Sequence, residues 1–264
     1  MSDAKNRDLP PPVPGSGAAF ERLTRVMARL RDKQSGCEWD RVQTYATIAP
    51  YTIEEAYEVA DAIQRGDMGE LKEELGDLAL QVVFHGQMAR EDGHFDVSDV
   101  MHAICDKLER RHPHLFGGDP SAERRWEEIK AAERAGKSED RSVMAGVALA
   151  LPALERAAKL QKRAARTGFD WPTIDGPKAK IFEELDEIAA ADTPEAIEEE
   201  VGDLLFAVVN LARFLKVAPE EALRKANIKF EKRFRTIEQT PGFSDMSLDE
   251  QEALWVGAKG EETP

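Results

Sequence analysis

Apolar residues recur with helical spacing along almost the whole chain. Ile181, Leu185 and Ile188 stand at positions i, i+4 and i+7, which places them on one face of a helix. A longer run with the same spacing extends from residue 201 to residue 215. No sustained alternation with a period of two is evident between turn residues, so no strand is predicted. The pattern therefore predicts an all-α protein.

Glycine and proline mark the predicted ends of these helices. The breaks fall at residues 66–69, 93, 117–120, 136, 168–172, 192–194 and 219. Residues 1–17 are rich in Pro, Gly and polar residues, and such a segment buries too little apolar surface to offset the entropy of ordering, so it is predicted to be a flexible tail. Residues 135–152 combine a charged stretch with a stretch of small residues, which is typical of a linker.

Four blocks of sequence occur twice, in the same order, at offsets between 122 and 129. The paired segments are 54–58 and 183–187, 74–78 and 200–204, 107–111 and 229–233, and the Trp and Lys at 126 and 130 and at 255 and 259. This recurrence indicates an internal duplication. We therefore predict an N-terminal helical module over residues 18–134 and a C-terminal module over residues 153–264, joined by the linker at 135–152.

Charge and composition limit the partners of these modules. The 264 residues contain 36 Lys and Arg and 51 Asp and Glu, which gives a net charge of −15. Such a surface repels nucleic acids and anionic membranes, and no apolar run approaches the roughly 20 residues needed to cross a bilayer. No signal peptide is recognisable, and the two isolated cysteines give no disulfide framework. These features predict a cytoplasmic protein that binds neither nucleic acid nor membranes.

Acidic residues in the second copy are spaced to lie together. Glu184 and Glu187 are three residues apart, as are Glu200 and Asp203, so each pair shares a helix face. If the two helices pack antiparallel, four carboxylates converge, and a cation is needed to offset their repulsion. Carboxylate oxygens are typical ligands of hard divalent ions. Mg²⁺ is the expected ion, with Mn²⁺ as a substitute.

Cationic and aromatic residues recur with these acids. Lys229 and Arg233 are four residues apart, as are Trp255 and Lys259. The simpler interpretations are that the acids solvate a helix surface, that Arg233 pairs with a neighbouring acid and that Trp255 belongs to the core. The joint recurrence instead favours a nucleotide carrying several phosphates, because a metal and cations neutralise phosphate oxygens and Trp can stack on a base. Metal-assisted hydrolysis is then the natural reaction, and no P-loop motif is present.

The doubled Glu-Glu-x-x-Glu and Glu-x-x-Asp motifs, together with residues 37–40 (CEWD) and 107–114, resemble the two-domain MazG-type nucleoside triphosphate pyrophosphohydrolases. The similarity extends over residues 18–260. The resemblance implies an all-α fold of the four-helix pyrophosphohydrolase type, a homodimer, and broad activity on ribo- and deoxynucleoside triphosphates. It also implies Mg²⁺-dependent attack of a metal-activated water on the α-phosphorus, which yields a monophosphate and pyrophosphate. The implied role is house-cleaning or control of nucleotide pools.

The resemblance also assigns site residues. In the C-terminal module it implies metal ligation by Glu184, Glu187, Glu200 and Asp203, and nucleotide contacts from Lys180, Lys229, Arg233, Trp255 and Lys259. The corresponding N-terminal residues are Glu55, Glu58, Glu74, Asp77, Lys107, Arg111, Trp126 and Lys130. Tyr51 stands in place of Lys180 and Phe84 in place of Asn210, so the N-terminal site is expected to be weaker and the C-terminal module to carry most of the activity. Glu38 stands where family members often have Pro.

Two other classes of protein compete with this interpretation. A di-iron carboxylate bundle needs Glu-x-x-His from two helices; Glu91 and His94 match that spacing, but Gly93 lies between them at a predicted helix end, so the ligand inventory is poor for iron. The second alternative is a non-catalytic nucleotide sensor or interaction module, which would bind nucleotide without turnover.

Overall fold

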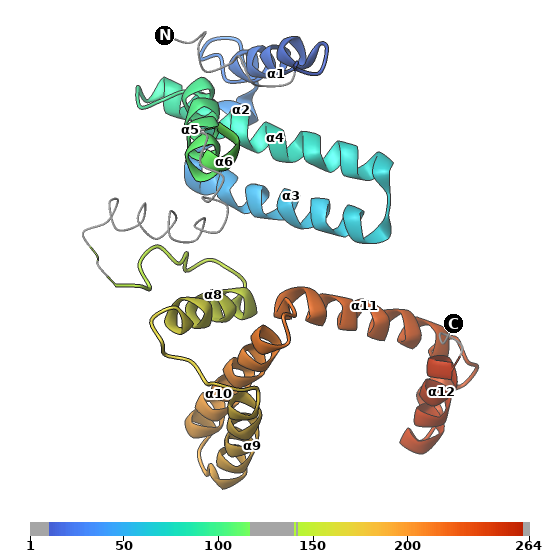
Figure 1. Cartoon of the computed structure of the whole chain (residues 1–264). Coiled ribbons are helices and arrows are strands. Elements are labelled where there is room, and N and C mark those ends of the chain that lie inside the picture. Colours follow the sequence, from blue (N-terminus) through green and yellow to red (C-terminus); the bar gives the residue numbers. More distant parts are fainter. Residues whose placement is uncertain (1–10, 117–139, 141, 261–264) are drawn as a thin grey trace. The chain divides into compact units, whose positions relative to one another are not determined.

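The computed structural model describes residues 11–116, 140 and 142–260. These residues form helices, turns and loops and include no strand, which confirms the all-α prediction. The chain divides into two compact units, residues 1–132 and 133–264, and each is described by itself (Figure 1).

The N-terminal unit is built on a hairpin of two long helices, α3 and α4 (Figure 1). Its helices are α1 (Ser16–Leu30), α2 (Glu38–Val42), α3 (Tyr45–Arg65), α4 (Met68–Glu91), α5 (Val97–Arg111) and α6 (Pro113–Phe116). Gly66 ends α3 with φ 71°, a conformation that residues with a Cβ rarely adopt. Asp67 then caps α4, because its side chain accepts hydrogen bonds from the backbone N–H groups of Gly69 and Glu70. This tight turn sets α3 and α4 antiparallel.

The core of the N-terminal unit joins α1, α3 and α4. Met27, Ile48, Val83, Phe84 and Met88 form a buried cluster, and they come from three helices whose apolar faces meet.

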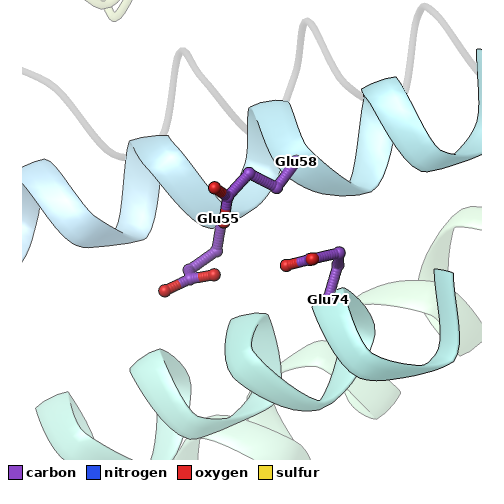
Figure 2. Close-up of side chains that lie close together, drawn as sticks. All are labelled: Glu55, Glu58 and Glu74. Atoms are coloured by element: carbon purple, nitrogen blue, oxygen red, sulfur yellow. The ribbon is translucent and has the colours of Figure 1, made fainter. Parts of the chain in front are cut away.

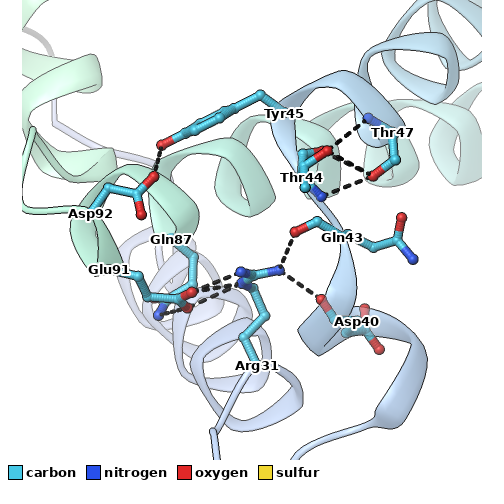
Figure 3. A network of polar contacts seen from close by, with 9 residues as sticks. All are labelled: Arg31, Asp40, Gln43, Thr44, Tyr45, Thr47, Gln87, Glu91 and Asp92. Carbon is cyan, nitrogen blue, oxygen red and sulfur yellow. Dashed lines mark hydrogen bonds and ion pairs between the residues drawn. The ribbon is translucent and has the colours of Figure 1, made fainter.

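A polar network ties the segment around α2 to this core (Figure 3). The Arg31 guanidinium pairs with Glu91 at 2.7 Å and donates hydrogen bonds to the backbone carbonyls of Asp40 at 2.6 Å and Gln43 at 3.3 Å. Burial opposes ionisation of Glu91, but hydrogen bonds from Arg31 and Gln87 outweigh it, and the pKa of Glu91 is lowered. Arg31 therefore joins the end of α1 to the end of α4 and to the α2 segment.

The C-terminal unit repeats the helix hairpin in α9 and α10, which pack against each other (Figure 1). Its elements are α8 (Ala153–Ala165), α9 (Asp175–Ala190), α10 (Pro194–Phe214), α11 (Pro219–Ile237), the 3₁₀ turn η2 (Phe243–Asp245) and α12 (Leu248–Gly260). Thr193 caps α10 by accepting from the backbone N–H of Ala196 at 3.2 Å, and Pro194 occupies the first helical turn. Helix α8 packs on α10, and α12 packs on α11.

Two boundaries can be compared with the sequence expectations. Helix α1 begins at Ser16, so the last two residues of the predicted tail are helical. Gly15 precedes it with φ 81°, which turns the chain into the helix. Residues 142–152, in the predicted linker, form turns and loops. No helix in the described ranges is long and apolar enough to cross a membrane.

Candidate active site

Three of the predicted acids in the C-terminal unit come together between α9 and α10. Glu184 and Glu187 from α9 and Glu200 from α10 each place a carboxylate oxygen within 4.8 Å of the others. The i, i+3 spacing puts the first two on one face of α9, and the hairpin brings the N-terminal half of α10 opposite them. Glu184 is only 2% exposed, and its Oε2 atom is buried without a hydrogen-bond partner. Such an orphaned acceptor is expensive unless something binds it.

Lys180 is the cation nearest to this cluster. Its ammonium lies 2.6 Å from Glu184 Oε1, 3.0 Å from Glu183 Oε1 and 4.0 Å from Glu187 Oε2. The hydrogen bond from Lys180 lowers the pKa of Glu184, whereas burial, together with the neighbouring acids, raises the pKa of Glu187 and of Glu200. One ammonium therefore leaves part of the negative charge uncompensated, and the site favours a further cation.

Asp203, the fourth predicted acid, lies beside the three-carboxylate cluster. It is one helical turn from Glu200 on α10, and its charge contributes to the raised pKa of Glu200, behind burial and Glu184. Its side chain also lines the cavity described below.

The N-terminal unit holds a corresponding cluster of Glu55, Glu58 and Glu74. Figure 2 shows the three carboxylates reaching toward one another from α3 and α4, and their oxygens lie within 4.8 Å. Burial is the main cause of the raised pKa of Glu55 and of Glu74, and Asp77 adds to both shifts. Tyr51, in the place of Lys180, lies with its ring 6.1 Å from that of Trp39. This position therefore supplies an aromatic ring where the C-terminal unit has an ammonium.

Both clusters fit a hard divalent cation and fit iron poorly. Each offers only carboxylate oxygens, which are the donors preferred by Mg²⁺ and Mn²⁺, and the orphaned Oε2 of Glu184 is an available ligand atom. Neither group contains a histidine. Glu91 of the Glu-x-x-His match at 91–94 is held by Arg31 instead, and neither this match nor the one at 109–112 contributes to a carboxylate cluster. The described residues therefore give no support to a di-iron centre.

The predicted nucleotide-contacting residues of α11 and α12 form a separate group. The Arg233 guanidinium and the Lys259 ammonium each lie 5.9 Å from the centroid of the Trp255 ring, and the Phe230 ring lies 5.2 Å from it. In Figure 1, α11 extends from the C-terminal end of α10, and α12 lies against α11. Lys229 lies on α11 four residues before Arg233. In the N-terminal unit, Lys107 and Arg111 lie on α5, while Trp126 and Lys130 lie outside the described residues.

A cavity of about 670 Å³ in the C-terminal unit was not predicted from the sequence. It lies among α8, α9, α10 and the loop that follows α8. Its lining includes Met144, Leu160, Gln161, Ala164, Phe169, Asp170, Trp171, Phe206, Asn210 and Arg213, and it reaches Lys180, Glu184 and Asp203. One signal could have identified the loop: Gly-Phe-Asp-Trp at 168–171 matches Gly-Cys-Glu-Trp at 36–39, at an offset of 132. The cavity adjoins the acidic cluster and so extends the candidate site.

These features define a duplicated helical protein in which each helix hairpin carries a carboxylate cluster. The MazG nucleotide pyrophosphohydrolase domain matches residues 43–116 and 176–237. The chain is 50% identical over 260 residues to the nucleoside triphosphate pyrophosphohydrolase of Escherichia coli K12, covering 92% of this chain and 98% of that protein. It is 45% identical over 251 residues to the nucleoside triphosphate pyrophosphohydrolase/pyrophosphatase MazG of Thermotoga maritima, covering 93% and 97%. The chain belongs to the MazG nucleotide pyrophosphohydrolase family, which confirms the resemblance found in the sequence.

Proposed function

We propose that this protein hydrolyses nucleoside triphosphates to nucleoside monophosphates and pyrophosphate, and that its C-terminal unit performs most of the turnover. The observation that carries the proposal is the cluster of Glu184, Glu187 and Glu200, which adjoins a cavity of about 670 Å³. This volume lies within the range of about 300–1,000 Å³ typical of small-molecule sites. The two relatives named above, which are nucleoside triphosphate pyrophosphohydrolases, support the same activity.

In the proposed mechanism, Glu184, Glu187, Glu200 and Asp203 would hold Mg²⁺, which Mn²⁺ could replace. When bound, the ion would act as a Lewis acid that neutralises phosphate charge and makes water a better nucleophile toward the α-phosphorus. Lys180 orients Glu184 through their 2.6 Å contact and provides an ammonium for the phosphate oxygens. We also propose nucleotide contacts from Lys229, Arg233, Trp255 and Lys259, which form a separate group on α11 and α12 and are assigned by the family resemblance alone.

The N-terminal unit is proposed to be a weaker site with Glu55, Glu58, Glu74 and Asp77 as its metal ligands. Lys107, Arg111, Trp126 and Lys130 are its proposed nucleotide contacts. Phe84 occupies the position of Asn210 and is buried in the core, and Tyr51 removes a cation. Both differences disfavour a bound triphosphate.

We also propose that the protein is a homodimer that accepts ribo- and deoxynucleotides. Exposed apolar side chains on three helices of the C-terminal unit support self-association, because patches of this kind usually mark interfaces. They include Phe182 and Leu185 on α9, Leu205 and Val208 on α10, and Leu223 and Phe230 on α11.

Product analysis tests the proposed activity. The wild-type protein is incubated with each common nucleoside triphosphate, with Mg²⁺ and with EDTA, alongside Glu200→Ala and the matched variant Glu74→Ala. We expect equal amounts of monophosphate and pyrophosphate, loss of turnover with EDTA and in Glu200→Ala, and retained turnover in Glu74→Ala. Orthophosphate as the product would refute the cleavage position, and turnover lost only in Glu74→Ala would refute the choice of unit. Nucleotide binding without product would indicate a sensor.

A further inference from the structure

The cavity of the C-terminal unit contains a buried glutamine that has an unused acceptor. Gln161 on α8 is 6% exposed, and its Nε2 donates a hydrogen bond to the backbone carbonyl of Phe206 at 2.8 Å. This bond fixes the orientation of the amide. Its Oε1 is buried without a hydrogen-bond partner, which costs free energy unless a ligand donates to it. Gln161 therefore presents an acceptor that the fold itself does not satisfy.

Asn210 on α10 presents the opposite polarity in the same cavity. It is 7% exposed, and its Oδ1 accepts hydrogen bonds from Arg213 Nε at 3.1 Å and from a terminal nitrogen of Arg213 at 2.7 Å. Arg213 is itself held by Asp170, with a second terminal nitrogen 2.9 Å from Oδ2. Because the guanidinium occupies Oδ1, the amide is oriented with Nδ2 as its remaining polar atom. Asn210 thus offers a donor.

The other walls of the cavity suit a flat, apolar ring. Leu160, Ala164, Phe169, Trp171 and Phe206 line it. Trp171 packs directly on Gly176 at the start of α9, where an added Cβ would overlap the Trp171 side chain. The glycine therefore allows the Trp171 side chain to lie against the helix, and an aromatic face of this kind stacks on bases of any type.

We propose that this cavity is the base-reading part of the nucleotide site, with Gln161 and Asn210 as its specificity-determining residues. Gln161 Oε1 accepts a hydrogen bond from an N–H of the base, Asn210 Nδ2 donates to an adjacent acceptor on the same edge, and Trp171 contacts the ring. This inference rests on the proposed function, because the neighbouring acids and Lys180 would hold the triphosphate. It differs from the expectation in the sequence analysis that Trp255 stacks on the base, because Trp171 takes that role here.

The N-terminal unit supports this assignment by contrast. Phe84 stands at the position of Asn210, is 3% exposed, and packs with Met27, Ile48, Val83 and Met88. The Arg31 guanidinium of α1 lies 5.3 Å from the centroid of its ring, whereas Arg213 of α10 orients the Asn210 amide in the other unit. At this position one copy therefore has a core side chain and the other an oriented amide.

Substrate analogues combined with one substitution test the inference. Each common nucleoside triphosphate is paired with an analogue that lacks one N–H on the base edge: purine riboside triphosphate for ATP, 4-deamino-CTP for CTP, and the N1-methyl and N3-methyl forms of GTP and UTP. Methyl triphosphate, which has no base, reports on the phosphate chemistry alone. In the wild-type protein we expect at least one pair to differ about tenfold or more in kcat/KM, because a site built to hydrogen-bond a substrate rejects the analogue that leaves its groups unpaired.

Gln161→Met keeps the length of the side chain but removes both the Oε1 acceptor and the Nε2 donor to the Phe206 carbonyl. The ratio within that pair is expected to fall toward one while turnover of methyl triphosphate stays within about twofold. Gln43→Met is the matched control, since the Gln43 amide also donates to a backbone carbonyl, that of Trp39 at 2.9 Å, but in the other unit. It should keep the wild-type ratio. Asn210→Asp retains the acceptor for Arg213 and removes the donor, and it should also lower discrimination between bases.

Each outcome decides the inference. If no pair differs in the wild-type protein, or if the ratio survives in Gln161→Met, base reading by Gln161 is refuted while the proposed activity stands. If no triphosphate yields pyrophosphate, the proposed function fails instead. Equilibrium binding of the unphosphorylated nucleosides to the wild-type protein and to Gln161→Met then tests separately whether the cavity binds the base. We expect weaker binding to the variant, and equal binding would refute a base contact by Gln161. Circular dichroism verifies that each variant is folded.

Discussion

Phe84→Ala should destabilise the N-terminal unit and leave turnover intact. The ring is 3% exposed within a cluster drawn from α1, α3 and α4, and the Arg31 guanidinium lies 5.3 Å from its centroid. Replacing a buried Phe by Ala costs about 3–5 kcal/mol, through lost transfer free energy and the cavity left behind. This is a large part of the roughly 5–15 kcal/mol that stabilises a typical domain.

Urea unfolding monitored by circular dichroism measures the effect. With a slope of about 2 kcal/mol per molar urea, a loss of about 4 kcal/mol shifts the midpoint of the N-terminal transition by about 2 M. Pyrophosphate release in the absence of urea should stay within about twofold of wild type, because the C-terminal unit is proposed to perform it. Phe95→Ala is the control, since Phe95 is an exposed aromatic in the same unit. A shift below about 0.5 M, or one equal to that of Phe95→Ala, would refute the assignment of Phe84 to the core.

Three further predictions concern the C-terminal unit. Hydrogen bonds from Arg213 lower the pKa of Asp170, so the pair stabilises the folded unit fully above the unfolded pKa of about 3.9, and this stabilisation is lost as the pH falls through the lower folded value. The urea midpoint of Asp170→Asn should therefore depend less on pH than that of the wild-type protein between pH 2 and 6. Equal pH profiles for the two proteins would contradict this. Gly176→Ala places a Cβ against Trp171. In assays of pyrophosphate release, it should lower kcat/KM for nucleotides about tenfold and leave kcat/KM for methyl triphosphate unchanged. Equal losses for both substrates would show a general defect instead. Leu223→Glu, on the exposed apolar face of α11, should weaken the proposed dimer and lower the molar mass measured by light scattering. Lys225→Glu on the same helix should leave the molar mass unchanged. A monomeric wild-type protein would refute the dimer.

The helices and the carboxylate clusters could be predicted from the sequence because each depends on local spacing. Apolar residues at i, i+4 and i+7 define a helix face wherever they occur. Glu184 and Glu187 share a face for the same reason, and the short connection to α10 brings Glu200 opposite them. The duplication strengthened the prediction, since Glu55, Glu58 and Glu74 repeat the arrangement.

The cavity could not be predicted because its polar atoms come from separate segments and acquire their roles only through packing. Gln161 and Phe206 are 45 residues apart in the chain, and Asp170 and Arg213 are 43 apart. Nothing in the local pattern around Gln161 distinguishes it from the solvent-exposed amides of an acidic protein. Its unsatisfied Oε1 becomes visible only when the carbonyl of Phe206 occupies its Nε2.

The two copies differ more in the cavity than in the carboxylate cluster, and this difference separates two kinds of recognition. Both units bring carboxylate oxygens of three glutamates within 4.8 Å of one another. Burial raises the pKa of Glu55 and of Glu74 in the N-terminal unit and of Glu187 and of Glu200 in the C-terminal unit, so the ionised form is disfavoured in both clusters. Such an arrangement is unfavourable without a cation, so its presence in both copies favours metal binding in both. Positions 84 and 210 then distinguish the two units: Phe84 completes the core, whereas Asn210, oriented by Arg213, lines the cavity. Metal binding is therefore expected in both units, and base reading only in the C-terminal one.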